Sequence, residues 1–236
     1  MLTIMDNGKG LELVASFTAT LLDNPEPQDV GEALAHAVQV ATDTYGAGVA
    51  VTDEDQRLQP LAVTGDDIRD VELSQLQPQD GPCVDAYRRS APVTVDDLHR
   101  TARWSELSRA AAAHGVRAVA AVPLGNEQSE VGVVTVYARG PRRWRRTRIK
   151  RAQVLADTAA LYLRGRRQLV DATTLAGQLQ HALDARIVIE QAKGMLAERW
   201  RIGVDEAFEL LRRRARSKQI KVRDVAADVV TRRIRS

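Results

Sequence analysis

A lysine and a glycine stand side by side in IEQAKGMLAERW (residues 189–200), a stretch whose other residues favour a helix. Glycine inside a helix costs about 1 kcal/mol relative to alanine, so Gly194 needs an explanation. One explanation is that the bare backbone admits another molecule, with Lys193 beside it binding a phosphate. The other is that Gly194 lets a second helix pack closely, and the residues alone leave both open.

More cationic residues follow toward the end of a predicted helix over 204–219. Acidic residues open this helix and basic residues close it, which matches the helix dipole. The basic side chains are suited to binding phosphate, although such a run also forms an ordinary solvated surface. They are Arg212, Arg213, Arg214 and Arg216 in the helix, with Lys218 and Lys221 in the following turn.

The single cysteine, Cys83, follows Gly81-Pro82, where we expect a helix to begin. A helix N-terminus lowers the pKa of a thiol, so a redox or ligand-sensing role is open for Cys83 and the neighbouring Asp85. The alternative for Cys83 is a buried, small apolar side chain. One cysteine also excludes an internal disulfide framework and a multi-cysteine metal site.

No other grouping of residues predicts catalysis or metal binding. The four histidines are scattered without metal-ligand spacing. The aspartate pairs at 66–67 and 96–97 are expected in caps and turns, with Asp66 capping a helix. Because no nucleophile, base and orienting residue stand out as a set, we expect a protein that is not an enzyme and has no metal site.

The charge of the chain is divided unequally between its two parts. Residues 1–140 hold 10 basic and 21 acidic side chains, a net charge of −11, and residues 141–236 hold 24 and 10, a net charge of +14. Such asymmetry suggests two functions, with the basic part a candidate for a nucleic-acid or acidic-membrane partner. A solvated, arginine-rich surface would have the same composition, so charge alone does not choose between these readings.

The first part alternates between helical and strand patterns. Helices are predicted over 11–23, 29–46, 66–77 and 104–115, with another starting at Pro82; strands are predicted over 48–52, 58–64, 91–98 and twice within 116–140. This order predicts an α+β fold, an antiparallel sheet flanked by helices. No cofactor is predicted, but a small ligand remains possible, and we would expect it around 81–98 and the strands of 116–137.

The second part is helical throughout. The proline-free run 145–200 predicts one long helix or two in series, followed by helices over 204–219 and 221–234, which together are enough for a small three-helix bundle. Apolar residues from Ala172 to Ala182 follow a near-heptad spacing, and the apolar faces of the last two helices are thin. We therefore predict a homodimer formed through residues 145–185.

Residues 179–230 closely resemble the ANTAR domain, and the first part resembles a GAF domain more loosely. The GAF resemblance rests on the order of helices and strands and on GPCVDA (81–86) followed by APVTVDDL. The ANTAR resemblance rests on Arg186-Ile187-Val188-Ile189, Gln191-Ala192-Lys193-Gly194, Glu206-Ala207-Phe208, Leu211-Arg212 with Ala215, and Val225-Ala226. The domains implied are a GAF-like sensory domain over 1–140, a basic helical linker over 141–170 and an ANTAR domain over 171–236.

The resemblance implies a transcription antitermination regulator of the actinobacterial type. ANTAR domains bind tandem RNA stem-loops in nascent leader transcripts, commonly as dimers, and so prevent a terminator hairpin from forming. The RNA-binding residues implied here are Arg186, Gln191, Ala192, Lys193, Gly194, Arg212, Arg213, Arg216, Lys218 and Lys221. The signal sensed by the GAF-like domain stays open among a cyclic nucleotide, another metabolite, a redox change and a protein partner.

A DNA-binding transcriptional regulator is the alternative, because a basic three-helix C-terminus can mimic a helix-turn-helix. Against it, the final predicted helix carries mostly apolar and acidic residues along its middle, whereas a recognition helix presents polar side chains to base edges. The chain shows neither a secretion signal nor an apolar run of about 18 residues. We therefore expect a cytoplasmic protein with no membrane partner.

Overall fold

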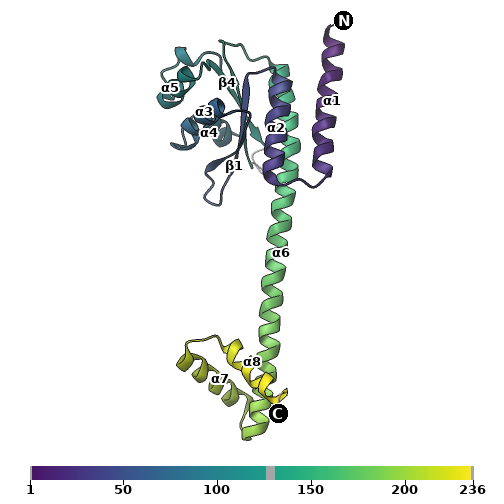
Figure 1. Cartoon of the computed structure of the whole chain (residues 1–236), viewed down its shortest axis with the longest axis vertical. Helices are drawn as coiled ribbons and strands as arrows, with labels where there is room; N and C mark the ends of the chain where they lie inside the picture. The colour runs from purple at the N-terminus through teal and green to yellow at the C-terminus, as the bar shows by residue number, and fades with distance from the viewer. Residues whose placement is uncertain (1, 126–130, 235–236) are drawn as a thin grey trace. The chain divides into compact units, whose positions relative to one another are not determined.

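The computed structural model describes residues 2–125 and 131–234, and their side chains from 10 to 231. The chain divides into two compact units, Met1–Arg167 and Gln168–Ser236, which we call the first and second units (Figure 1). The first unit contains a five-stranded antiparallel sheet with helices, and the second is helical. The α+β fold expected from the sequence is therefore confirmed.

The sheet has the strand order β2-β1-β5-β4-β3, and every neighbouring pair is antiparallel. Its strands are β1 (Gly46–Thr52), β2 (Leu58–Val63), β3 (Val93–Val95), β4 (Ala118–Leu124) and β5 (Gly132–Ala138). The three central strands are almost wholly buried, because helices cover both faces of the sheet. This explains why 116–140 reads as continuous apolar runs rather than as an alternation of apolar and polar residues.

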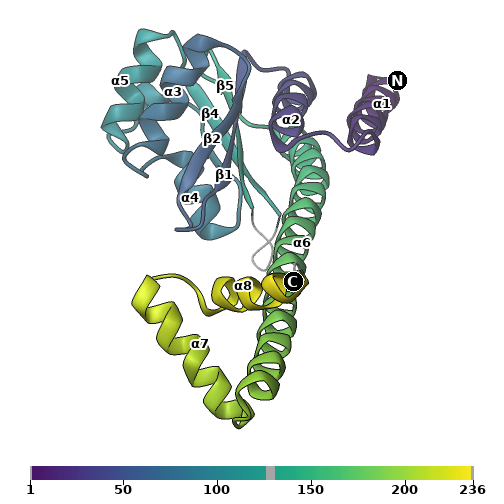
Figure 2. The ribbon, with the colours of Figure 1, turned by 60° about the horizontal axis from the view of Figure 1, so that its bottom comes forward.

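Helices of different parts of the chain cover the two faces of the sheet (Figure 2). One face packs against α2 (Pro27–Thr42) and the first part of α6 (Arg146–Trp200), and α1 (Leu2–Leu22) packs against α2 on the side away from the sheet. The other carries α3 (Asp66–Leu76), α4 (Pro82–Arg89), the short 3-10 helix η1 (Leu98–Arg100) and α5 (Ser105–Ala113). Successive residues of a strand point to opposite faces, so Val134 and Val136 of β5 join the first core and Tyr137 joins the second.

The basic segment 141–170, expected to link two domains, contributes to the core of the first unit. Helix α6 begins at Arg146, and its residues Ala152, Leu155, Ala156 and Ala159 are fully buried against the sheet. The prediction that Asp66 caps α3 is wrong. Gly65 occupies the cap position and the Asp66 side chain is exposed, because Asp66 already lies in the first helical turn.

The second unit contains the end of α6 together with α7 (Val204–Lys218) and α8 (Val222–Ile234). Its small core consists of Ala192 from α6, Leu211 and Ala215 from α7, and Val225 and Ala226 from α8. Of the two possibilities left open for 145–200, the structure shows one continuous helix. It ends at Trp200, where Arg201 adopts a positive φ of 54° and the chain turns into α7.

Candidate functional site

Two of the predicted RNA-binding cations meet at one aromatic ring in the second unit. Lys193 of α6 and Arg212 of α7 lie over the Phe208 ring, with their cationic groups 5.4 and 5.5 Å from its centroid. Each is also paired with a glutamate one helical turn earlier: Lys193 Nζ donates to Glu190 at 2.9 Å, and Arg212 Nη1 donates to Glu209 Oε1 at 2.9 Å. The tertiary structure thus unites two cations that are 19 positions apart.

The two cations differ in their access to solvent. The Arg212 side chain is 44% exposed, whereas that of Lys193 is 15% exposed, because its stem is covered beside Phe208. Arg212 therefore offers its charge to a partner directly, and Lys193 contributes its charge from the edge of the cluster. Phe208 was part of the ANTAR resemblance but absent from the predicted site. Its position four residues before Arg212, on the same helix face, is the signal that could have identified it.

Most of the other predicted RNA-binding residues lie on the surface of the second unit. The exposed ones are Arg186, Gln191, Gly194, Arg213, Arg216, Lys218 and Lys221. Ala192, which the resemblance placed among the RNA-binding residues, is fully buried in the core, where α7 and α8 pack against α6. Of the two neighbours open to it, RNA or another helix, the structure shows the helices. Its role is to let the helices approach one another.

Gly194 behaves differently from its neighbour. A Cβ built at this position meets no atom within 4 Å among the described residues, and the residue is exposed. In the described part of the chain, no helix therefore needs the glycine in order to pack against α6. The geometry therefore does not support the explanation that Gly194 allows close helix packing within the chain. The bare backbone at Gly194 faces outward instead.

The interior of the first unit contains a carboxyl group that sequence reasoning missed. Glu72 of α3 is completely buried; Tyr137 Oη donates a hydrogen bond to its Oε2, while Oε1 has no hydrogen-bond partner among the described residues. Gln75 Nε2 donates to Tyr137 Oη at 2.8 Å, and the Cys83 backbone N–H donates to Gln75 Oε1 at 3.1 Å. Glu72 lies four residues after Ile68 and four before Leu76, so its place on the buried face of α3 was the available signal.

Burial determines the protonation of the groups in this cluster. Loss of hydration raises the pKa of Glu72 from 4.5 to about 7, with the Tyr137 hydrogen bond acting in the opposite direction. Burial also raises the pKa of Cys83 well above its ordinary value, and the nearby Glu72 raises it further. Of the two roles left open for Cys83, the structure therefore favours the buried, small apolar side chain, because burial outweighs the effect of the helix N-terminus on the thiol.

Asp85, predicted together with Cys83 as a ligand-sensing residue, is engaged by arginines. Its Oδ2 lies 2.6 Å from Arg103 Nη2 and 3.6 Å from Arg89 Nη2. The carboxylate is only 10% exposed, so these ion pairs compensate for its partial burial. Asp85 and Cys83 share helix α4, but the Asp85 side chain pairs with arginines, whereas Cys83 is buried and its backbone N–H donates to Gln75.

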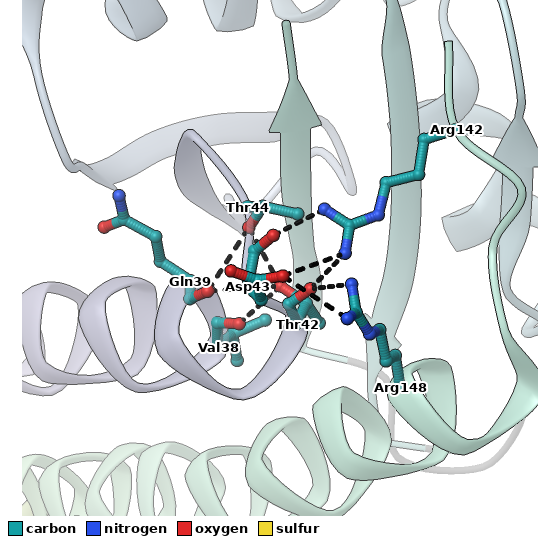
Figure 3. A network of polar contacts seen from close by, with 7 residues as sticks. All are labelled: Val38, Gln39, Thr42, Asp43, Thr44, Arg142 and Arg148. Carbon is teal, nitrogen blue, oxygen red and sulfur yellow. Dashed lines mark hydrogen bonds and ion pairs between the residues drawn. The ribbon is translucent and has the colours of Figure 1, made fainter. Parts of the chain in front are cut away.

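Two arginines hold the end of α2 near the start of α6 (Figure 3). Arg142 donates to the backbone oxygens of Thr42 and Asp43, and Arg148 of α6 donates to Thr42 O at 3.1 Å. Asp43 adopts the left-handed conformation at the C-cap, and its carboxylate is 3.3 Å from Arg148 Nη2. We call this group, Thr42, Asp43, Arg142 and Arg148, the α2 clamp; it places positive charge at the negative end of a helix dipole.

The described residues contain no group of three or more histidine, cysteine, aspartate or glutamate side chains that could hold a metal ion. Among the helices of that same part of the chain, none is long and apolar enough to cross a membrane.

Comparison with known families identifies both parts of the chain. Residues 177–230 match the ANTAR domain model, and residues 26–164 match a GAF domain model. A search among curated proteins gives no significant match.

Solved structures similar to this chain are GAF domains. The GAF domain of a phosphoenolpyruvate-protein phosphotransferase from Coxiella burnetii is 11% identical and matches with a TM-score of 0.56 over 69% of this chain and 96% of that one. The GAF domain of a putative sensor histidine kinase from Pseudomonas syringae pv. tomato is 16% identical, with a TM-score of 0.54 over 73% and 96%. At these identities the likeness shows the fold alone.

Proposed function

Because the chain belongs to the proteins that join a GAF domain to an ANTAR domain, we propose that it is a transcription antitermination regulator. Its ANTAR domain binds RNA stem-loops in nascent leader transcripts, and its GAF domain controls that binding in response to a signal. It has no catalytic activity of its own and acts in the cytoplasm. The observation that carries the proposal is the ANTAR match over 177–230, whose two best-placed cations converge on Phe208.

Charge and exposure in the second unit support an RNA partner. The exposed arginines and lysines of α6, α7 and the turn after α7 offer several phosphate contacts, and the bare backbone at Gly194 lies one residue from Lys193. RNA loops are recognised largely by shape and stacking, so a surface that combines small and cationic residues is suitable. The Phe208 ring lies under the cationic groups of Lys193 and Arg212 but is itself only partly exposed.

The DNA-binding alternative has less support from the final helix. Val225 and Ala226 of α8 are buried, and Val222, Val229 and Val230 pack against the same core. These residues, from the first position of α8 through its middle, form an apolar face, whereas a recognition helix would need polar side chains directed toward base edges.

We also propose that the protein acts as a homodimer through α6. From residue 168 to 184 every residue of this helix is exposed within the chain, including Leu175 at 56% and Leu179 at 62%. Exposed leucines at near-heptad spacing are typical of a helix that pairs with a second copy. Light scattering should report a dimer, and replacing both Leu175 and Leu179 with aspartate should give a monomer; a monomeric parent protein would contradict the proposal.

Crosslinking of the full chain in its native host, followed by sequencing of the bound nucleic acid, tests the function. We expect hairpins that lie upstream of terminators, and recovery of duplex DNA would favour the alternative. The recovered hairpin is then titrated with the parent, Lys193→Ala and Arg212→Ala proteins over a salt series. Each lost phosphate contact should reduce the log–log salt slope by about 0.7–0.9.

Arg223→Ala is the matched control for these two variants. Arg223 is half exposed on α8 and lies 3.8 Å from an acidic neighbour, Asp224, but it is outside the predicted interface. It should change neither affinity nor slope. Unchanged binding by Lys193→Ala and Arg212→Ala would refute the assigned contacts, and a loss of helicity parallel to the loss of binding would make the residues structural.

A further inference from the structure

The first unit is built to hold the Glu72 carboxyl inside its core. A Cβ on Gly48 of β1 would lie 2.7 Å from both Cδ and Oε2 of Glu72, so the absence of a side chain at Gly48 makes the room that the carboxyl occupies. Burying a carboxyl costs free energy that an apolar side chain of the same size would not. A core that contains such a group, with a glycine in the neighbouring strand that leaves room for it, indicates a function for the group.

The groups that face Glu72 come from three further elements as well as from α3. They are Tyr137 of β5, Cys83 of α4, Gly48 of β1 and Gln75 of α3 itself. Burial and the nearby Glu72 raise the pKa of both Tyr137 and Cys83, so both side chains are neutral. The charge of Asp85 on α4 also raises the pKa of Cys83, and the Asp85 carboxylate itself forms an ion pair with Arg103. Within the described part of the chain, no lysine, arginine or histidine forms an ion pair or hydrogen bond with the Glu72 carboxyl. Ionisation would therefore leave a buried negative charge without a cation.

We propose that the Glu72 carboxyl is a proton-binding site, and that its ionisation state is a signal sensed by the GAF domain. This deepens the sensor role in the proposed function by naming the input. Burial raises the pKa of Glu72 to about 7, so the carboxyl gains and loses its proton within the physiological range. Oε1, which has no partner, is available to carry the proton, while Oε2 accepts from Tyr137.

Tyr137 connects the carboxyl to the region where α6 begins. Its carbonyl accepts a hydrogen bond from the Tyr45 N–H at 2.9 Å, and Tyr45 lies two residues after Asp43 of the α2 clamp. Arg142, the other side of the clamp, lies five residues after Tyr137 along the chain. The backbone around Tyr137 therefore joins the Glu72 contact to both sides of the clamp, which also includes Arg148 of α6, and this is the route by which we expect a change at Glu72 to reach α6.

The protonation step is tested on the full chain labelled with ¹³C at glutamate side-chain carboxyls. One carboxyl signal should titrate with a midpoint near pH 7, be absent from Glu72→Gln, and persist in Glu106→Gln, a control at an exposed position of α5. Tyr137→Phe removes the hydrogen bond that favours ionisation, so it should move the midpoint upward. If no carboxyl titrates above pH 6, or if Glu72→Gln leaves such a titration intact, the proposal is overturned.

Coupling to α6 is tested with 5-fluorotryptophan in the same chain. The Trp144 indole N–H donates to Val95 O at 3.1 Å just before α6 begins, so its ¹⁹F shift reports on that junction. This shift should titrate with the Glu72 midpoint in the parent and Glu106→Gln proteins and be constant in Glu72→Gln. A Trp144 titration that survives in Glu72→Gln refutes the sensing role.

Binding of the hairpin recovered by crosslinking separates this proposal from the proposed function. Between pH 6 and 8 the affinity should change by about fivefold or more in the parent and Glu106→Gln proteins, with a smaller change in Glu72→Gln. If RNA fails to bind at any pH while the carboxyl and Trp144 titrate together, the proton site stands and the RNA-binding function is wrong. If the affinity depends on pH equally in parent and Glu72→Gln, Glu72 is not the input.

Discussion

Replacing Glu72 with glutamine should remove a large pH dependence from the stability of the first unit. In the folded chain the pKa of Glu72 is about 7, against an ordinary value of 4.5. Between these pH values the folded carboxyl keeps its proton and the unfolded carboxyl has lost it. The stability contributed by the neutral carboxyl is therefore fully present below pH 4.5, declines as the pH rises, and is lost above pH 7.

The size of this effect follows from the two pKa values. Each pH unit between them corresponds to about 1.4 kcal/mol, so the total loss is about 3 kcal/mol. Glutamine has nearly the same shape, can accept from Tyr137 through its oxygen, and does not ionise. The Glu72→Gln protein should match the parent near pH 4.5 and exceed its stability at pH 8 by about 3 kcal/mol, or about 6–12 °C in unfolding temperature for a unit of this size.

Thermal unfolding followed by tryptophan fluorescence measures the effect, because Trp104 belongs to the same core cluster as Ile68 and Tyr137. The scans run from pH 4.5 to 8.5 on the parent, Glu72→Gln and Glu106→Gln proteins, and only Glu72→Gln should flatten the profile. Parallel profiles for the parent and Glu72→Gln would show that the buried carboxyl does not titrate in this range, and the reasoning from burial would be refuted.

Three further predictions concern Gly48, the two arginines of the α2 clamp, and Gly194. Gly48→Ala should lower the free energy of unfolding by about 1–3 kcal/mol, because the added methyl group overpacks against Glu72. In a Glu72→Ala background this loss should nearly disappear, and a double-mutant cycle measured by urea denaturation tests this. Arg142→Ala and Arg148→Ala should each lower the free energy of unfolding by about 1–3 kcal/mol, because each removes charged hydrogen bonds to the end of α2. The double variant should lose less than the sum of the two; strictly additive losses in denaturation would mean that the two arginines do not act as one clamp. Gly194→Ala and Gly177→Ala should both raise helix stability by up to about 1 kcal/mol, because the added Cβ meets open space at either position. Only Gly194→Ala should weaken hairpin binding; if the two variants bind the hairpin equally well in a titration, Gly194 is not part of the interface.

The sequence by itself determined the order and type of the elements. Apolar spacing of three to four predicted the helices of the second unit, and the strand patterns of 48–52 and 58–64 correspond to β1 and β2. These signals are local, because each helix or strand carries its own periodicity and its own end signals. The ANTAR resemblance was likewise carried by residues within one stretch of about fifty, and the family comparison confirms it.

Only the tertiary structure decided which residues lie inside and which meet. Glu72 was not singled out from the sequence, and only the tertiary structure shows that Gly48 of β1 and Tyr137 of β5 lie against it. Ala192 and Gly194 are two positions apart on α6, yet one is buried and the other faces outward, because α7 and α8 cover a single side of the helix. Local periodicity places Glu72 on the same helix face as Ile68 and Leu76, but the residues that meet that face come from distant parts of the chain, so periodicity alone does not identify them.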